Sequence, residues 1–270
     1  MIGSVSAVAA GSSGCHIFSG CGYPSPGLQD FDFKPIFSIG SFHFTKPMLI
    51  AIICAACVIV FFLAAFRRPK LVPRGVQNLG ELALLAVRDQ ILRPNLGKRG
   101  DSFLPFLTAL FFFIWLMNLM EIIPFFQFPA TSRSGFPWSL VAVVYLTYLY
   151  LGFRHQGALG YLKNMIPRDV PLFVLVILLP VEFLRFFIVQ PFTLGVRLFA
   201  NMFAGHLLLL IFYLATWYLA SLSVGLVFAA TSAIMVLAVT VLELVIQLLQ
   251  AFIFTTLAAT YIADSLEGSH

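Results

Sequence analysis

Seven polar side chains that can carry, bind or relay charge interrupt the apolar C-terminal half of the chain. Arginine holds a permanent positive charge, carboxylates and imidazole take up and release protons, and carboxamides bridge such groups through hydrogen bonds. Ionisable groups inside long apolar segments are costly, so we expect them to serve a function. The residues are Glu182, Arg197, Asn201, His206, Glu243, Gln247 and Gln250.

Arg197 is the most informative of these residues, because a guanidinium cannot shed its charge to escape an apolar environment. An anionic or aqueous group must therefore face it. One interpretation is a fixed cation that acts on a carboxylate which arrives and departs. The alternative is a buried ion pair with Glu182 or Glu243.

Helical periodicity sorts the other polar residues into faces. At about 100° per residue, Asn201 lies on the face of Arg197, whereas His206 lies on the opposite face. Further along, Thr240, Glu243, Gln247 and Gln250 share an arc of about 80°. This stripe predicts contact with a partner helix or a file of water, with interhelical hydrogen bonding as the plainer alternative. We interpret His206 and Glu243 as a proton-relay pair, although a lone histidine in a membrane often only packs.

The composition excludes a soluble enzyme and a nucleic-acid binder. Hydrophobic residues make up 60% of the 270 residues and charged residues only 10%, against about 25% charged in an ordinary globular domain. The net charge of +5 resides in loops. The sequence therefore predicts an all-α, multi-pass membrane protein with an amphipathic surface helix and a long, tilted, membrane-embedded helical hairpin.

The order of apolar and polar segments predicts the organisation of the chain. An arm outside the membrane (1–46) precedes the first span, an amphipathic segment follows it, and two further spans with an outer loop come next. The predicted segments after the arm are a transmembrane helix (47–66), the amphipathic segment (67–101), two spans (102–153), a loop (154–170), the hairpin (171–263) and a tail (264–270).

The hairpin is predicted from the length of its uncharged run. Counting His206 as neutral, no formal charge lies between Arg197 and Glu243. About 45 residues in one helix would measure roughly 68 Å, more than twice a hydrocarbon core of about 30 Å. A turn near 221–225 would divide this run into strongly tilted helices over about 190–220 and 225–263.

Basic residues predict the orientation. Segment 67–99 carries Arg67, Arg68, Lys70, Arg74, Arg88, Arg93, Lys98 and Arg99, whereas loop 126–137 carries only Arg133. The positive-inside rule places 67–99 in the cytoplasm, the N-terminus outside and the C-terminus inside.

Cysteine usage gives little further information. Cys15 and Cys21 in the arm can form a disulfide in an oxidising compartment, and the sequence does not decide whether they do. With His16 as the only nearby ligand, we expect no metal there, and we expect no cofactor elsewhere.

Two motifs carry a resemblance to a known family. The run Gln190-Pro-Phe-Thr-Leu-Gly-Val-Arg-Leu-Phe-Ala-Asn-Met-Phe-Ala-Gly-His206 resembles the signature of subunit a of rotary F-type ATP synthases, and Gln250-Ala-Phe-Ile-Phe254 is similar to a second one. The layout of spans fits as well, and the arm and the stretch 111–124 resemble actinobacterial members.

The resemblance implies a role for each site residue. Arg197 would face the ion-carrying carboxylate of the rotating subunit c ring, with Asn201 beside it and Gln250 near it from the neighbouring helix. His206 and Glu243 match a coupled acid–base pair, Gln247 belongs to the same stripe, and Glu182 would line a cytoplasmic half-channel. Glu121 and Asn118 either belong to an entry vestibule or cap a helix.

The implied function is that of a proton-conducting stator subunit, not catalytic by itself, in a bacterial plasma membrane. Its partners would be the subunit c ring, the subunit b peripheral stalk, protons and the lipid bilayer. His206 favours H+ over Na+. Two other functions were weighed: a self-contained ion transporter, for which no mirrored half-site is visible, and an intramembrane hydrolase, for which no His-Glu-x-x-His spacing exists.

Overall fold

The computed structural model describes a protein built almost entirely of helices. Its only strands among the described residues are a short antiparallel hairpin, β1 (Phe37–Ile39) and β2 (Phe42–Phe44), within the predicted arm. Cys15 and Cys21 lie outside the described residues, so the disulfide stays a prediction. The structure describes residues 37–39, 42–123, 130–132, 135–157, 160, 172–220 and 225–266.

Five helical segments of the described chain are long and apolar enough to cross a membrane: Lys46–Phe66, Gly100–Leu119, Gly135–Gln156, Leu178–Leu219 and Gly225–Leu266. The predicted all-α, multi-pass class is thereby confirmed. The two final segments have 42 residues each, which would give helices of roughly 63 Å. They exceed a hydrocarbon core of about 30 Å, as the uncharged run predicts.

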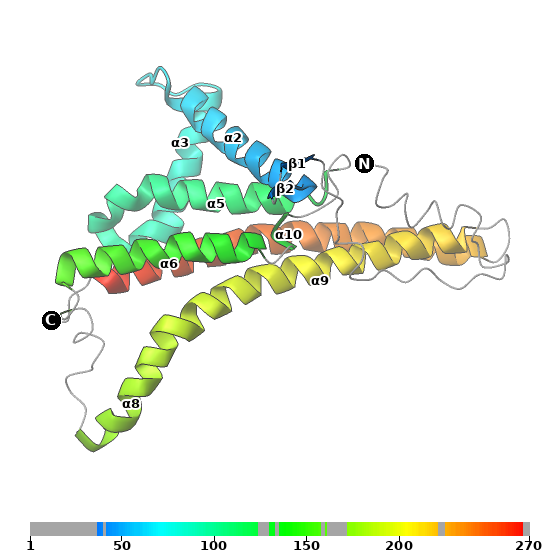
Figure 1. The fold of residues 1–270 in the computed structure, drawn as a ribbon. Coiled ribbons are helices and arrows are strands. Elements are labelled where there is room, and N and C mark those ends of the chain that lie inside the picture. Colours follow the sequence, from blue (N-terminus) through cyan, green and yellow to red (C-terminus); the bar gives the residue numbers. More distant parts are fainter. Residues whose placement is uncertain are drawn as a thin grey trace. The chain divides into compact units, whose positions relative to one another are not determined.

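The helices follow the predicted order (Figure 1). The first span is α2 (Lys46–Phe66), and the amphipathic segment folds as α3 (Val76–Val87), η3 (Arg88–Leu92), α4 (Arg93–Leu96) and η4 (Gly97–Phe103). Next come α5 (Leu104–Leu119), the short η5 (Ala130–Ser132) and α6 (Gly135–Gln156). The C-terminal part comprises α8 (Leu172–Leu184), η6 (Arg185–Val189), α9 (Gln190–Leu219) and α10 (Gly225–Leu266).

Two five-residue π turns each end two residues before a proline. In η3 the amide of Arg93 donates to the carbonyl of Arg88, and in η6 the amide of Gln190 donates to that of Arg185. Pro94 and Pro191 have no amide hydrogen to donate, so a wider turn accommodates each of them. Helical structure therefore continues from α8 through the π turn into α9, which begins at Gln190 as predicted.

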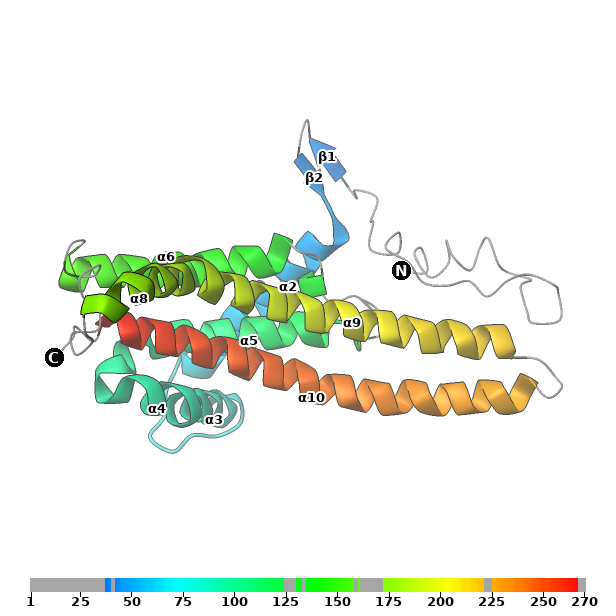
Figure 2. The same ribbon diagram turned by 90° about the horizontal axis from the view of Figure 1, so that it is seen from below.

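The chain forms two compact units, and four helices contribute to both. One unit comprises residues 1–54, 115–133 and 200–249, and the other comprises 55–114, 134–199 and 250–270. In the first unit, α9 and α10 run side by side (Figures 1 and 2), and Ser232 Oγ donates to the carbonyl of Phe212 at 3.0 Å. The first unit therefore contains the parts of α9 and α10 that lie within 200–249.

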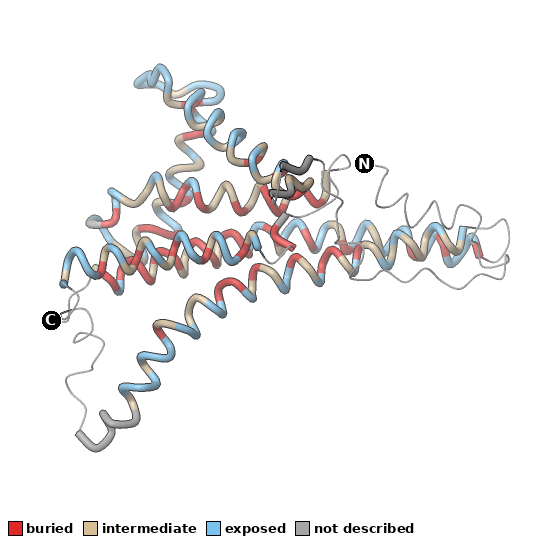
Figure 3. The backbone as a smooth tube through the Cα atoms, viewed as in Figure 1, coloured by how far each residue is buried: buried red, intermediate tan, exposed pale blue. Residues whose placement is uncertain are grey.

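Helix α10 supports the second unit through polar and aromatic contacts. Thr260 Oγ1 donates to Asn95 Oδ1 of α4 at 3.0 Å, and Gln156 Nε2 of α6 donates to the carbonyl of Ser265 at 2.9 Å. The rings of Tyr148 and Tyr261 meet edge to face. Buried and exposed residues alternate along α10 (Figure 3), so one face packs inward and the other remains available to lipid or partners.

Candidate functional site

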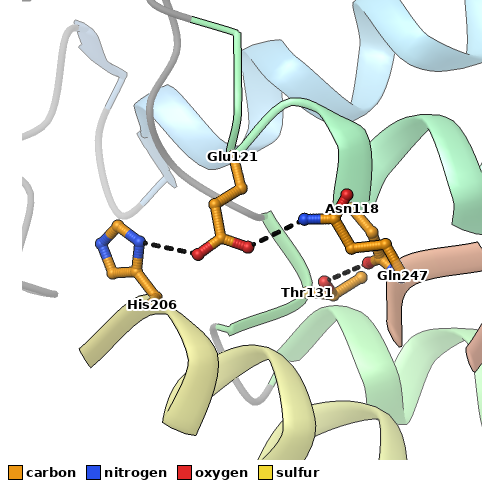
Figure 4. Close-up of polar contacts among 5 residues, drawn as sticks. All are labelled: Asn118, Glu121, Thr131, His206 and Gln247. Atoms are coloured by element: carbon orange, nitrogen blue, oxygen red, sulfur yellow. Dashed lines mark hydrogen bonds and ion pairs between the residues drawn. The ribbon is translucent and has the colours of Figure 1, made fainter. Parts of the chain in front are cut away.

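The first unit contains a buried polar cluster centred on Glu121. Helix α5 ends at Leu119, and a turn closed by the amide of Glu121 on the carbonyl of Asn118, at 3.0 Å, follows it. This turn directs the Glu121 side chain toward α9 and α10 (Figure 4), where only 1% of it is exposed. A carboxylate so far from water needs hydrogen-bond donors of its own.

Both oxygens of the Glu121 carboxylate have partners. His206 Nδ1 of α9 lies 3.3 Å from Oε1, and Gln247 Nε2 of α10 donates to Oε2 at 3.1 Å (Figure 4). An imidazole and a carboxylate at hydrogen-bond distance can exchange a proton, since either group can hold it. The arrangement therefore joins three helices through a pair of titratable groups.

A second hydrogen bond extends the cluster toward η5. Thr131 Oγ1 donates to Asn118 Oδ1 at 2.6 Å, and both residues are fully buried. Within the described part of the chain, three buried atoms of this region have no hydrogen-bond partner: Asn118 Nδ2, Gln247 Oε1 and Glu243 Oε2. Buried polar atoms are normally satisfied by protein or by water, so this region suits ordered water.

Glu243 lies against α9 at Gly205. The residue is 3% exposed, and a Cβ atom built on Gly205 would overlap all three atoms of its carboxyl group. In the conformation observed, the Glu243 carboxyl group occupies the space where a side chain at position 205 would begin. Gly205 therefore lets this carboxyl group lie against the backbone of α9.

Substituting Gly205 with alanine is expected to push the Glu243 carboxyl group aside; because that group is the end of a flexible side chain, the loss in free energy of unfolding should be at most about 1 kcal/mol. Thermal unfolding of the purified protein measures the effect. Gly135→Ala is the matched control, since its Cβ would meet nothing within 4 Å. Adding Glu243→Ala should recover most of the loss; equal losses in the single and double variants would contradict the contact.

The structure gives His206 a partner that the sequence analysis did not assign to it. His206 Nδ1 lies at hydrogen-bond distance from Glu121, and the relay between His206 and Glu243 stays a prediction. Periodicity groups residues within one helix, and Glu121 comes from the end of another helix, 85 residues away. Its signal in the sequence was a carboxylate at the end of an apolar span, which can equally cap a helix.

Arg197 lies on α9 in the second unit. Leu194, Gly195 and Leu198 are buried, and a Cβ on Gly195 would lie 3.3 Å from Val141 of α6. The Arg197 side chain is half-buried, and no hydrogen bond or ion pair joins it to another described residue.

Glu182 has a different cationic partner from the one weighed in the sequence. Arg185 Nη1 lies 2.8 Å from Glu182 Oε1, one helical turn away. The structure therefore shows no buried ion pair between Glu182 and Arg197. Glu182 keeps 28% of its side chain exposed, so the pair is partly open to its surroundings.

The remaining predicted site residues differ in how deeply their side chains are buried. Asn201 is exposed on α9, whereas Gln247 and Gln250 are buried on α10, at 0% and 2%. The stripe predicted on the last helix therefore does turn inward. No group of three His, Cys, Asp or Glu in the described ranges could hold a metal ion.

Comparison with known proteins decides the family. The model of the ATP synthase A chain family matches residues 48–263. The chain belongs to the ATP synthase A chain family. A protein called ATP synthase subunit a from Streptomyces lividans is 44% identical over 97% of this chain and 95% of its own length. Those of Parafrankia sp. and Rhodococcus erythropolis are 44% and 42% identical, over 88% and 91% of this chain and 80% and 91% of theirs.

Membership of the ATP synthase A chain family confirms the resemblance read from the two motifs. Both motifs, Gln190–His206 and Gln250–Phe254, lie inside the matched range. The polar cluster of the first unit and Arg197 of the second unit lie inside it too. Together with the five apolar segments, this makes the chain a multi-pass membrane component of an ATP synthase.

Proposed function

We propose that the chain is the proton-conducting stator subunit of an F-type ATP synthase, with two offset half-channels that load and unload the carboxylates of a rotating subunit c ring. The observation that carries this proposal is Arg197, a cation on a membrane-length helix with no ion pair to any described residue. A charge in that position needs an anion, and the described residues do not supply one.

The chemistry of Arg197 fits a carboxylate that moves past it. At about 4 Å and an effective dielectric constant of about 20, the attraction is of order 4 kcal/mol. That energy favours the ionised carboxylate by about 10³-fold, so the ring site releases its proton as it passes. The fixed cation also repels hydronium, which prevents direct leakage of protons between the half-channels. Asn201, exposed one turn later, lies on the same face.

The cluster around Glu121 supplies the entry path in this mechanism. A proton from outside passes Glu121 and His206, which lie at hydrogen-bond distance, and the region of Glu243 and Gln247 continues the path through water. It then neutralises a ring carboxylate, which can rotate through lipid once it is uncharged. In this proposal Glu182 lines the cytoplasmic exit, and Gln250 of α10 lies near Arg197.

Orientation and partners follow from the same proposal. The eight basic residues of 67–99 face the cytoplasm by the positive-inside rule, which leaves the N-terminus outside and the C-terminus inside a bacterial plasma membrane. The exposed apolar faces of α9 and α10 contact the subunit c ring and lipid, and subunit b of the peripheral stalk holds the chain in place. ATP chemistry takes place on other subunits.

Replacing His206 with alanine tests the entry path. The variant should slow passive proton flux through membranes stripped of the catalytic sector, by about tenfold or more, because it removes one proton carrier. Coupling of the remaining flux to rotation should persist. His155→Ala is the matched control, since His155 is exposed near the end of α6. An unchanged rate in the His206 variant would remove this residue from the path.

A further inference from the structure

A basic pocket lies where the first span meets the amphipathic segment. It has a volume of about 550 Å³, and Arg67, Arg68, Lys70 and Arg74 line it together with Gln77. All four cationic residues are exposed, and none of them forms an ion pair with a described residue. Four adjacent positive charges without counter-ions repel one another, so an anion would stabilise the pocket.

Gln77 fixes the shape of the pocket. It accepts a hydrogen bond from the amide of Lys70 at 3.0 Å and donates to the carbonyl of Lys70 at 2.8 Å. Its Nε2 also donates to Glu81 Oε1, one turn later on α3, at 2.8 Å. The loop between α2 and α3 is thus held at both its start and its end, and the cations are arranged before a ligand arrives.

Close helix packing completes the frame. A Cβ on Gly80 of α3 would lie 2.6 Å from Cβ of Ala65, so α3 approaches α2 more closely than any larger residue allows. Gly75, with φ of 62°, makes the sharp entry into α3. Figures 1 and 2 show α3 following α2 after a short loop. The pocket therefore belongs to a rigid corner rather than to a free loop.

Exposed apolar side chains lie near the cations in the sequence. Leu71 and Val72 are 104% and 67% exposed, and Leu79 of α3 is 56% exposed. Leu63, one turn before the end of the span, is 66% exposed. Cations beside outward-facing apolar groups, at the end of a membrane-length helix, match a phospholipid, whose phosphate and acyl chains need both kinds of contact.

We propose that this pocket binds the phosphate of an anionic phospholipid, with the acyl chains lying against the exposed apolar residues of α2 and α3. An acidic segment of another protein would satisfy the cations but would leave Leu71 and Val72 facing water. The proposal is independent of proton transfer, because none of the pocket residues belongs to the Glu121 cluster or to α9.

The test uses the intact membrane sector, freed of lipid by detergent exchange and titrated with phosphatidylglycerol, phosphatidylcholine or inorganic phosphate. Native mass spectrometry counts the bound molecules. We expect Arg68→Gln/Arg74→Gln to weaken phosphatidylglycerol binding about 30-fold, from two lost attractions to phosphate. Lys98→Gln/Arg154→Gln removes the same charge from exposed positions elsewhere and should change binding by no more than about twofold.

Three results would overturn the proposal. An equal loss in both double variants would show a diffuse charge effect, equal binding of phosphatidylcholine would show that charge is not recognised, and equal affinity for inorganic phosphate would show a small-anion site. Photoreactive phosphatidylglycerol gives a second measurement on the unaltered complex. Cross-links should map to residues 64–77; cross-links of this segment to another subunit alone would indicate a protein occupant instead.

Discussion

Arg197→Ala should abolish ATP-driven proton pumping while the complex still assembles. The guanidinium makes no hydrogen bond or ion pair with a described residue, so its removal costs the fold little. The lost attraction of about 4 kcal/mol to a ring carboxylate corresponds to about 10³ in the proton-release equilibrium. Acidification of inverted membrane vesicles on addition of ATP measures the effect, and co-purification with the ring measures assembly.

Two further variants sharpen that experiment. Arg185→Ala removes a cation of the same type that is already paired with Glu182 at 2.8 Å, and it should retain most of the pumping activity. Arg197→Lys keeps a positive charge but loses the planar fork and can deprotonate when buried, so we expect it to pump poorly. Near-normal pumping by Arg197→Ala would refute the assigned role.

The second large effect is expected from Glu121→Gln. The substitution keeps the shape of the side chain and an acceptor for Gln247 but removes the group that can hold a proton beside His206. Since a positioned acid or base contributes about 10²–10⁴-fold to proton transfer, passive proton flux through stripped membranes should fall by about 10²-fold. Thermal stability should change little, because both hydrogen-bond partners stay in place.

The control for Glu121 is Asp89→Asn. Asp89 is an exposed acid on η3, and its neutralisation should leave the flux unchanged. If Glu121→Gln conducts protons at the normal rate, then the carboxylate only closes the end of α5 and the entry path runs elsewhere. A flux lost together with thermal stability would instead indicate a structural role.

The sequence predicted the spans well because their signal is local. Uncharged runs of membrane length ended where the structure ends α2, α5 and α6, to within a few residues. The hairpin helices were expected over about 190–220 and 225–263, and the structure has Gln190–Leu219 and Gly225–Leu266. The length of an apolar run and the charges that end it are almost sufficient to predict the bounds of such a helix.

The candidate site was predicted less completely, because it depends on contacts between helices. Periodicity correctly grouped Glu243, Gln247 and Gln250 on a buried stripe. It gave no means of pairing His206 with Glu121, and it gave no reason for glycine at position 205. Those features depend on which helices are neighbours, and spacing within a single helix does not contain that information.

The π turn before Pro191 has a consequence for how helix α9 is oriented about its own axis. A π turn accommodates one residue more than an α-helical turn does, and one residue corresponds to about 100° of rotation. In a regular helix, each residue between α8 and Arg197 would turn the chain by about 100°. Because the π turn contains one extra residue, Arg197 faces a direction about 100° away from the one that a regular helix would give it. Glu182 lies before the extra residue and Arg197 after it, so this insertion changes the direction in which the Arg197 guanidinium faces.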